Sequence, residues 1–353
     1  MKGNRILMIY KGPLGTLTDN YKWCYYLRNE FDITFVELAG PGHIDLDGIN
    51  IITVSNKGNR VIRGLRFILT ALVQILFFKG LVIVFYFDGC SIFKRLLPWK
   101  KMILDIRTLS VEKNKDDRER SDEILRQTCF SYDFITIIQK DLINKLSIDE
   151  RKVTVIPLGA DVISNMPKTY DALRLLYVGT LDGRRIDETI KGVALFKERH
   201  PEADIVYTIV GDGVVDHKEQ LESLVSDLDL ENVVNIVGRV PYNKLQPFFD
   251  KSNIGVSYVP KTDWYEHQPP TKTFEYIMSG LYCIGTSTSE NGKIINNSNG
   301  ILHNDNPNDF AIALETIYVN RNMFSFTDIH KSLLEWQWSS IVNLRLIPFL
   351  RKL

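Results

Sequence analysis

The sequence has few of the features that define several large protein classes. It contains only four cysteines, far apart, with no C-x-x-C pair and no clustered histidines, so neither a disulfide framework nor a structural zinc site is expected. Neither sign of charge is in excess, because 43 basic residues balance 43 acidic ones, which argues against a protein whose whole surface binds nucleic acid. The apolar run near the N-terminus, ILMIY, is too short for a secretion signal, and the cytoplasm is the expected compartment.

A long unbroken apolar run is also missing. The best candidate for a membrane span, residues 67–87, is interrupted by Lys79 and Gly80 after a helix-like segment, and β-branched residues follow. This pattern predicts a helix followed by a strand.

Apolar runs of strand length alternate with helical patterns almost throughout the chain. The expected strands are RILMIY, DITFVEL, INIITVS, LVIVFYF, KMILDIR, DFITIIQ and KVTVIPL in the first half, and LRLLYVG, DIVYTIVG, NVVNIVG, NIGVSYV, LYCIGT and GILH in the second. Continuous apolar strands separated by helices are typical of parallel sheets covered on both faces. The sequence therefore predicts an α/β protein of two doubly wound domains, residues 1–165 and 166–330, with the polar stretch 164–171 as the linker.

Ligands of doubly wound domains bind beyond the carboxyl ends of the strands. The loops expected there are KGPLGTLTDN, FDGCS, GTLDGRR, GDGV, GRVPYN and PKTDWYEHQPPTK. Gly12 and Gly15 allow close approach of the backbone to a ligand, but they do not form G-x-G-x-x-G, and Glu37 is only a weak candidate for the acid that a dinucleotide site needs. A dehydrogenase is therefore disfavoured.

The segment PPTKTFEYIMSG, residues 269–280, predicts a short amphipathic helix. Its apolar positions repeat with helical spacing at Phe274, Ile277, Met278 and Leu281. Two prolines leave Thr271 placed to cap the first turn, and Gly280 is expected to end the helix. The unpaired amides and the helix dipole favour an anion there. Glu275, expected in the first turn, either complements the dipole, which the helix alone favours, or serves a ligand.

Taken in order, several segments resemble the retaining glycosyltransferases of family 4, which have the GT-B fold of two Rossmann-like domains facing a cleft. They are TIIQKDLINKL, KVTVIPLGAD, LLYVGTL, IVGDG, VVNIVGRVP, PTKTFEYIMSGLYCIGT and NGILH. The tail, EWQWSSIVNLRLIPFLRKL, is similar to the GT-B terminal helix, so residues 331–353 are expected to pack back on the first domain. The resemblance covers nearly the whole chain and implies a nucleotide-sugar donor.

The resemblance also implies roles for individual residues. Glu275 corresponds to the second glutamate of the family's E-x7-E motif, which accepts hydrogen bonds from the ribose, while the amides of Thr271 and Lys272 hold the pyrophosphate. The first glutamate of that motif is replaced by His267, with Glu266 one place off. The variant P-[ST]-K-x-x-E-Y then implies altered sugar recognition.

The basic pair of the family is also incomplete. Thr180 stands where its first member is expected, whereas Arg185, with Arg184 beside it, matches the second. Asp88 and Arg107 are expected near the cleft, each as a substrate contact or as a structural ion pair or strand cap. The full set of residues implied for the donor is Gly12, Gly15, Gly179, Gly211, Gly238, Arg239, Pro270, Thr271, Lys272 and Glu275, and for transfer Arg184, Arg185, Glu266, His267 and Asp88.

Metal-dependent transferases use a D-x-D motif instead. The sequence DLD occurs at Asp45 and at Asp227, in a turn and on a helical stripe respectively, and both read as solvated surface. No metal or other cofactor is expected.

Basic residues are concentrated between residues 57 and 101, where nine of them accompany one acidic residue. Arg60, Arg63 and Arg66 precede an apolar run, and SIFKRLLPWKK mixes bulky apolar with basic residues. Such a surface attracts an anionic membrane, and the alternative is a solvated helix face over a buried core helix. We expect peripheral contact with the inner face of the cell membrane.

The resemblance therefore implies a metal-independent retaining glycosyltransferase. It would move a sugar from a nucleotide diphosphate sugar to a glycan or lipid-linked acceptor in the synthesis of a surface polysaccharide or glycolipid. Two alternatives stay open. One is a catalytically silent nucleotide-sugar-binding subunit. The other is a GT-B nucleotide-sugar epimerase, although this sequence lacks the histidine and acidic residues that such an epimerase is expected to have.

Overall fold

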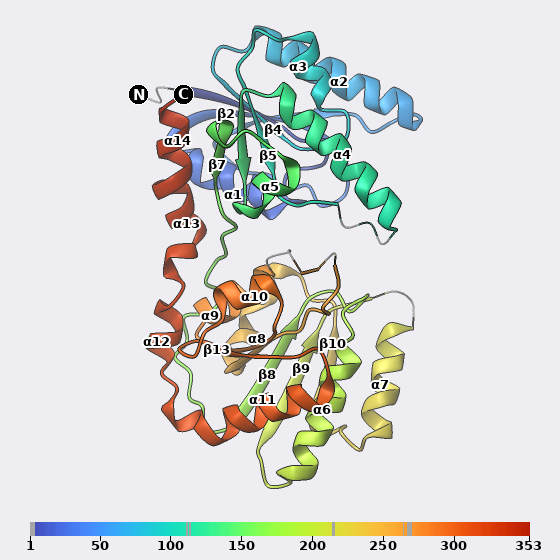
Figure 1. Cartoon of the computed structure of the whole chain (residues 1–353), viewed down its shortest axis with the longest axis vertical. Helices are drawn as coiled ribbons and strands as arrows, with labels where there is room; N and C mark the ends of the chain where they lie inside the picture. Colours follow the sequence, from blue (N-terminus) through green and yellow to red (C-terminus); the bar gives the residue numbers. More distant parts are fainter. Residues whose placement is uncertain (1–3, 111, 113, 214–215, 264, 267–269) are drawn as a thin grey trace. The chain divides into compact units, whose positions relative to one another are not determined.

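The protein was analysed as a computed structural model, which describes residues 4–110, 112, 114–213, 216–263, 265–266 and 270–353 (Figure 1). The chain divides into two compact units. The first comprises Met1–Leu158 and Trp338–Leu353, and the second comprises Gly159–Gln337. The domain boundaries expected from the sequence, at 165 and 330, lie a few residues from these.

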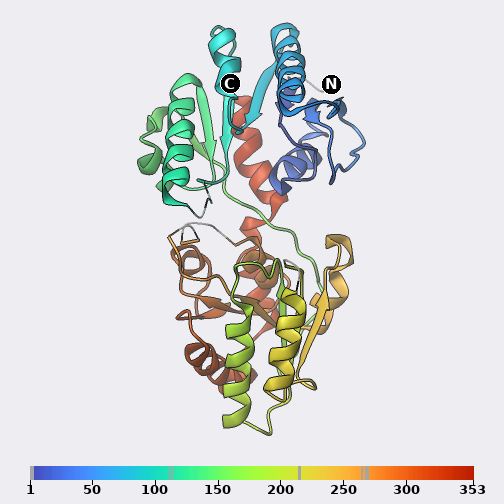
Figure 2. The same ribbon diagram turned by 90° about the vertical axis from the view of Figure 1, so that its right-hand side faces the viewer.

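The first unit contains a parallel sheet of seven strands in the order β3-β2-β1-β4-β5-β6-β7. The strands are β1 (Asn4–Ile9), β2 (Phe31–Leu38), β3 (Asn50–Val54), β4 (Leu81–Phe85), β5 (Met102–Ile106), β6 (Phe134–Ile137) and β7 (Val153–Val155). The connecting helices are α1 (Thr18–Leu27), α2 (Arg60–Phe77), α3 (Ser91–Leu96), α4 (Lys115–Ser131) and α5 (Asp141–Leu146), with a 3₁₀ turn at Glu150–Lys152. The sheet lies between its helices (Figures 1 and 2), so its central strands are buried, as the continuous apolar runs predict.

The second unit contains a parallel sheet of six strands in the order β10-β9-β8-β11-β12-β13. The strands are β8 (Leu173–Val178), β9 (Ile205–Val210), β10 (Val234–Gly238), β11 (Ile254–Ser257), β12 (Tyr282–Thr286) and β13 (Gly300–His303). The helices are α6 (Ile186–Arg199), α7 (His217–Asp227), α8 (Gln246–Lys251), α9 (Thr271–Met278), α10 (Ser289–Ile294), α11 (Pro307–Asn320) and α12 (Phe326–Lys331), with 3₁₀ turns at Tyr242–Lys244, Arg321–Met323 and Leu334–Trp336. Every strand expected from the sequence is present, and the α/β class is confirmed.

The apolar run at residues 67–87 forms most of α2 and then β4, as its break at Lys79 and Gly80 predicts. Within the part of the chain that the structure describes, no helix is both long enough and apolar enough to cross a membrane.

The stretch expected to be a linker, residues 164–171, instead packs into the second unit. Ser164 is buried and its hydroxyl donates to Asp250 Oδ1 over 2.5 Å. Tyr170, also buried, donates its hydroxyl to the carbonyl of Gly280 over 2.6 Å. These long-range contacts hold a polar, proline-bearing segment that local sequence alone reads as a connection.

The end of the chain belongs to the first unit, where the sequence places it. α13 (Trp338–Ile341) continues through a π-helical turn at Val342–Leu346 into α14 (Ile347–Arg351), and Arg351 pairs with Glu30 over 2.7 Å. Pro348 has no N–H to donate to the preceding turn, which accounts for the irregular hydrogen bonding just before it.

Candidate functional site

The order of the strands reverses between β8 and β11 in the second unit, and this is where a doubly wound domain binds its ligand. Three of the glycines singled out in the sequence lie together at the ends of β8, β9 and β10. The N–H of Gly179 donates to Val210 O over 3.0 Å, and that of Gly211 donates to Gly238 O over 2.9 Å. A Cβ on Gly211 would lie 1.8 Å from the carbonyl oxygen of Gly179. Only glycine therefore allows these loops to approach so closely.

Helix α9 is fixed against the same strands by buried polar contacts. The hydroxyl of Tyr276 accepts a hydrogen bond from Val178 N over 2.7 Å, and its ring packs on Gly255. One turn earlier, Thr273 Oγ1 lies 2.6 Å from Ser257 Oγ and 3.0 Å from Asn291 Oδ1. These contacts hold the start of α9 beside the loop that follows β8.

The sequence predicted the C-terminal end of α9 correctly, but not its N-terminal end. The apolar stripe is buried, and Gly280 follows the C-cap residue with a φ of 75°, as predicted. At the other end the cap position is occupied by Pro270, and Thr271 is the first helical residue. The predicted Thr271 cap is therefore wrong. The amide of Thr273 donates to the Pro270 carbonyl over 3.1 Å, but proline has no side-chain acceptor for the amides of Thr271 and Lys272, which can therefore bind an anion. Glu275 lies beyond the first turn, contrary to expectation.

Lys272 brings a positive charge to the end of β8. Its ammonium lies 4.0 Å from the centre of the Tyr177 ring, and a Cβ on Gly179 would be 2.8 Å from its Nζ. Burial, and then the nearby Arg184 guanidinium, lower the pKa of Lys272 to about 7. The sequence singled out only the backbone amide of this residue. A charged side chain next to a backbone glycine and another cation is an arrangement that an anion would stabilise.

The two arginines after β8 have different surroundings. The guanidinium of Arg184 lies over the ring of Tyr265, 4.2 Å from its centre, and among the described residues its buried Nε finds no acceptor. Arg185 is 48% exposed and pairs with Asp305 over 3.0 Å and with Glu188 over 3.3 Å. The charge of Arg184 therefore acts on Lys272, whereas Arg185 is held by two carboxylates.

Arg239 begins the loop that follows β10, and Glu275 of α9 contacts the same loop through Tyr242. The carboxylate of Glu275 accepts a hydrogen bond from the Tyr242 hydroxyl over 3.1 Å. Arg239 is exposed and lies 3.6 Å from Asp212. The first of these contacts holds the carboxylate at a partly exposed position, where a ligand hydroxyl can reach it.

Glu266 has a structural partner that the sequence did not reveal. One of its carboxylate oxygens accepts hydrogen bonds from both the backbone N–H and the hydroxyl of Ser289, at 2.9 and 2.7 Å. Ser289 is the first residue of α10, so this carboxylate stabilises the beginning of that helix. His267 lies outside the described residues.

The remaining candidates lie in the first unit, whose strand order reverses between β1 and β4. Gly12 and Gly15 are in the loop after β1, and Asp88, in the loop after β4, accepts the Tyr86 hydroxyl over 2.9 Å. Arg107 is nearly buried and pairs with Asp105 over 2.6 Å and with Asp19 over 3.2 Å. For Arg107 these contacts favour the structural ion pair over a direct substrate role.

Two other sequence features have local roles. Glu37, the weak dinucleotide candidate, is buried and accepts hydrogen bonds from Leu14 N and Thr53 Oγ1, each over 2.7 Å, so it anchors the loop after β1. Asp45 of the first DLD lies 3.0 Å from His43. Among the described residues, no three His, Cys, Asp or Glu side chains are placed to hold a metal ion.

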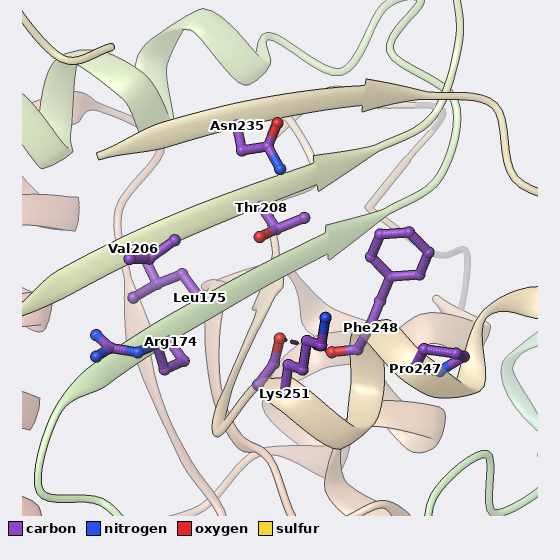
Figure 3. Close-up of a pocket in the computed structure, with 9 residues that line it drawn as sticks. Arg174, Leu175, Val206, Thr208, Asn235, Pro247, Phe248 and Lys251 are labelled. Atoms are coloured by element: carbon purple, nitrogen blue, oxygen red, sulfur yellow. Dashed lines mark hydrogen bonds between the residues drawn. The ribbon is translucent and has the colours of Figure 1, made fainter. Parts of the chain in front are cut away.

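A separate cavity of about 510 Å³ lies on the face of the second sheet that α8 approaches (Figure 3). Arg174, Thr208 and Asn235 line it from β8, β9 and β10, and Phe248 and Lys251 line it from α8. These residues lie within the strands and on α8, away from the strand ends that carry the candidate donor residues.

Comparisons with known proteins define the class. Residues 172–320, from the start of β8 to the end of α11, match the family model described as glycosyl transferases group 1. None of the curated protein sequences matches this chain.

Three solved structures show the same fold. Sucrose-phosphate synthase from Thermosynechococcus elongatus has a TM-score of 0.73 and 14% identity, covering 99% of both chains. Anabaena HepE in complex with UDP has a TM-score of 0.74 and 11% identity, covering 99% of this chain and 100% of that one. The lipopolysaccharide outer core galactosyltransferase WaaB has a TM-score of 0.70 and 14% identity, covering 98% and 99%.

The fold is therefore GT-B, and the resemblance found in the sequence is confirmed. Most of the second unit matches the glycosyl transferases group 1 model, and the whole chain shares its fold with solved glycosyltransferase structures.

Proposed function

We propose that this chain is a glycosyltransferase that retains anomeric configuration and moves a sugar from a nucleoside diphosphate sugar to a glycan or lipid-linked acceptor without a metal ion. The observation that supports this most strongly is the ammonium of Lys272, at the start of α9, beside Gly179 and within the electrostatic influence of Arg184. Two cations and a helix N-terminus at a topological switch point form a site for a diphosphate.

Lys272 supplies the charge that Thr180 lacks. At the first position of the basic pair the sequence has the uncharged Thr180. Helix α9, however, brings the ammonium of Lys272 to Gly179, the residue just before Thr180. As the bond between the sugar and the diphosphate breaks, negative charge grows on the leaving group. A cation fixed where that charge develops stabilises the transition state more than the ground state. Arg184 adds a second charge and can engage phosphate oxygens through two N–H groups.

Glu275 binds the ribose in this proposal. Its carboxylate is partly exposed and is oriented by Tyr242 from the loop after β10. A carboxylate can accept hydrogen bonds from both hydroxyls of a ribose. The similarity to HepE, solved with UDP, makes a uridine nucleotide the first probe to use. WaaB, a lipopolysaccharide galactosyltransferase, supports an acceptor from surface polysaccharide or glycolipid synthesis.

The test is release of nucleoside diphosphate from a panel of UDP- and GDP-sugars, in the presence of a chelator, with and without lipid-linked saccharide acceptors. We expect one donor to be turned over, and the product to keep the donor's anomeric configuration by NMR. An inverted product would contradict the retaining mechanism, and a requirement for added metal would contradict metal independence. Binding of a nucleotide sugar without turnover of any acceptor would favour the silent subunit.

The pKa of Lys272 predicts how nucleotide affinity depends on pH. In the free protein this lysine loses its proton as the pH rises through about 7, whereas a bound diphosphate favours the charged ammonium. Binding therefore takes up a proton above pH 7, and affinity for UDP is expected to fall between pH 7 and 9. Titration calorimetry in buffers of different ionisation enthalpy measures this uptake directly. The Lys272→Arg variant should bind without proton uptake in that range, and an equal uptake by both proteins would contradict the assignment.

A further inference from the structure

Helix α2 in the first unit exposes an unusual number of apolar side chains. We define the α2 stripe by residues that are 43–76% exposed: Val61, Ile62, Leu65, Leu69, Val73, Leu76 and Phe77. Five of them follow one another at intervals of four residues, from Val61 to Phe77, so they form a continuous row along the helix. An apolar row of this length on a surface indicates a binding partner.

The opposite face of α2 already holds the helix on the sheet. Phe67, Ala71 and Ile75 are completely buried, and Asn59 caps the helix by accepting a hydrogen bond from Ile62 N over 2.9 Å. The α2 stripe is therefore not part of the core of the first unit. The sequence analysis weighed a surface that attracts an anionic membrane against a solvated helix face over a buried core helix, and the exposed apolar residues of the α2 stripe favour the first of these.

A second apolar group lies at the same end of the unit. Trp99 is 67% exposed and Leu96 is 53% exposed, and Figures 1 and 2 place α3 at the same end of the first unit as α2. The ammonium of Lys100 donates to the carbonyl of Phe78 over 2.9 Å. This bond ties the segment that carries Trp99 to the end of α2, so the two apolar groups adjoin.

The α2 stripe is accompanied by positive charge. The sequence of α2 contains three arginines and no acidic residue. Arg63 donates to Asn56 Oδ1 over 2.9 Å, and Arg66 donates to the carbonyls of Ser55 and Lys57 over 2.9 and 3.1 Å. These acceptors are neutral, so they orient the guanidinium groups without cancelling their charge. The exposed Lys57 and Lys79 flank α2 in the sequence, and the exposed Arg95 and Lys101 accompany Leu96 and Trp99.

We propose that the α2 stripe, with Leu96 and Trp99, docks on an anionic lipid membrane. An amphipathic helix with apolar residues on one side and basic residues at its margins lies in the plane of a bilayer surface, held by apolar burial and by attraction to anionic headgroups. A second copy of this chain is the less suitable occupant, because pairing two such surfaces would bring like charges together at their margins. The inference does not depend on the donor site in the second unit.

The test is sedimentation of the full chain with vesicles of phosphatidylcholine alone or mixed with phosphatidylglycerol. We expect binding to the mixed vesicles that weakens with salt. The triple variant Leu65→Ser, Leu69→Ser and Val73→Ser is expected to bind the vesicles about a hundredfold or more weakly, because less apolar area is then buried in the membrane. Replacing Lys79 and Lys101 by glutamine is expected to weaken binding about fivefold for each charge.

Matched controls keep the result interpretable. Ile312→Ser, Val319→Ser and Met323→Ser change three exposed apolar residues of the second unit and should leave vesicle binding unchanged. All variants should retain the thermal unfolding and the nucleotide response of the wild type, which separates this inference from the proposed donor site. Equal binding by the α2 triple variant and the wild type, or no binding by the wild type, would overturn the proposal. So would a wild-type dimer that the α2 triple variant converts to a monomer, since the stripe would then be a self-association surface.

Discussion

Replacing Lys272 by methionine is expected to lower the rate of nucleoside diphosphate release about 10²–10³-fold, the usual effect of losing one fixed donor to developing charge. Methionine keeps the length of the side chain beside Tyr177 and Gly179 but removes the charge. The measurement is kcat for hydrolysis of the nucleotide sugar, followed by release of the diphosphate. Because the ammonium acts on the leaving group, kcat should fall more than KM rises.

Two further variants make this prediction specific. Lys272→Arg keeps a positive charge and should recover much of the rate, although a guanidinium differs from an ammonium in shape. Lys218→Met removes an exposed lysine of α7 that pairs with Glu222 and should leave the rate unchanged. If Lys272→Met turned over donor as fast as the wild type, Arg184 or Arg185 would have to carry the charge, and the role given to Lys272 would be wrong.

Replacing Gly211 by alanine is expected to destabilise the second unit by about 1–3 kcal/mol, the usual cost of overpacking, and to abolish nucleotide binding. The added methyl group would meet the carbonyl of Gly179 at 1.8 Å, and backbone atoms cannot move aside as a flexible side chain can. Separation of these loops would displace the end of β8, where the diphosphate is proposed to bind. Denaturant unfolding gives the stability change, and calorimetry with UDP gives the loss of binding.

Gly292→Ala provides the matched control. Gly292 lies within α10, and a Cβ there would meet nothing within 4 Å. Alanine is the better helix former, so this variant should be as stable as the wild type or slightly more stable. A Gly211→Ala protein that unfolds like the wild type and binds UDP would show that the loops can separate without consequence.

The fold was largely predictable because parallel strands covered on both faces have a simple sequence pattern, a continuous apolar run. Runs such as LVIVFYF are apolar without alternation, LRLLYVG departs from this only at Arg174, and each is followed by a helical period, so both sheets could be expected before any tertiary contact was known. The buried stripe of α9 and its end at Gly280 were predictable for the same reason, since both depend on local spacing.

The candidate site was less predictable because its contacts join distant parts of the chain. Arg185 meets Asp305 across 120 residues, and Glu266 meets Ser289 across 23, so neither partner can be found from spacing. The side chain of Lys272 reaches Gly179 only because Tyr276 and Thr273 fix α9 against β8 and β11. The roles of Glu275 and Lys272 in binding a donor stay predictions, as does the role of Arg185.

The most direct test of the donor site is titration calorimetry of UDP and GDP against the wild type and Glu275→Ala, without added metal. We predict that the wild type binds one of these nucleotides and that the variant binds it about 10–100-fold more weakly, since a charged acceptor of ribose hydrogen bonds is lost. Glu222→Ala, an exposed position of α7, serves as the control. Equal affinity of the wild type and Glu275→Ala, or no binding of either nucleotide to the wild type, would contradict the donor site at the start of α9.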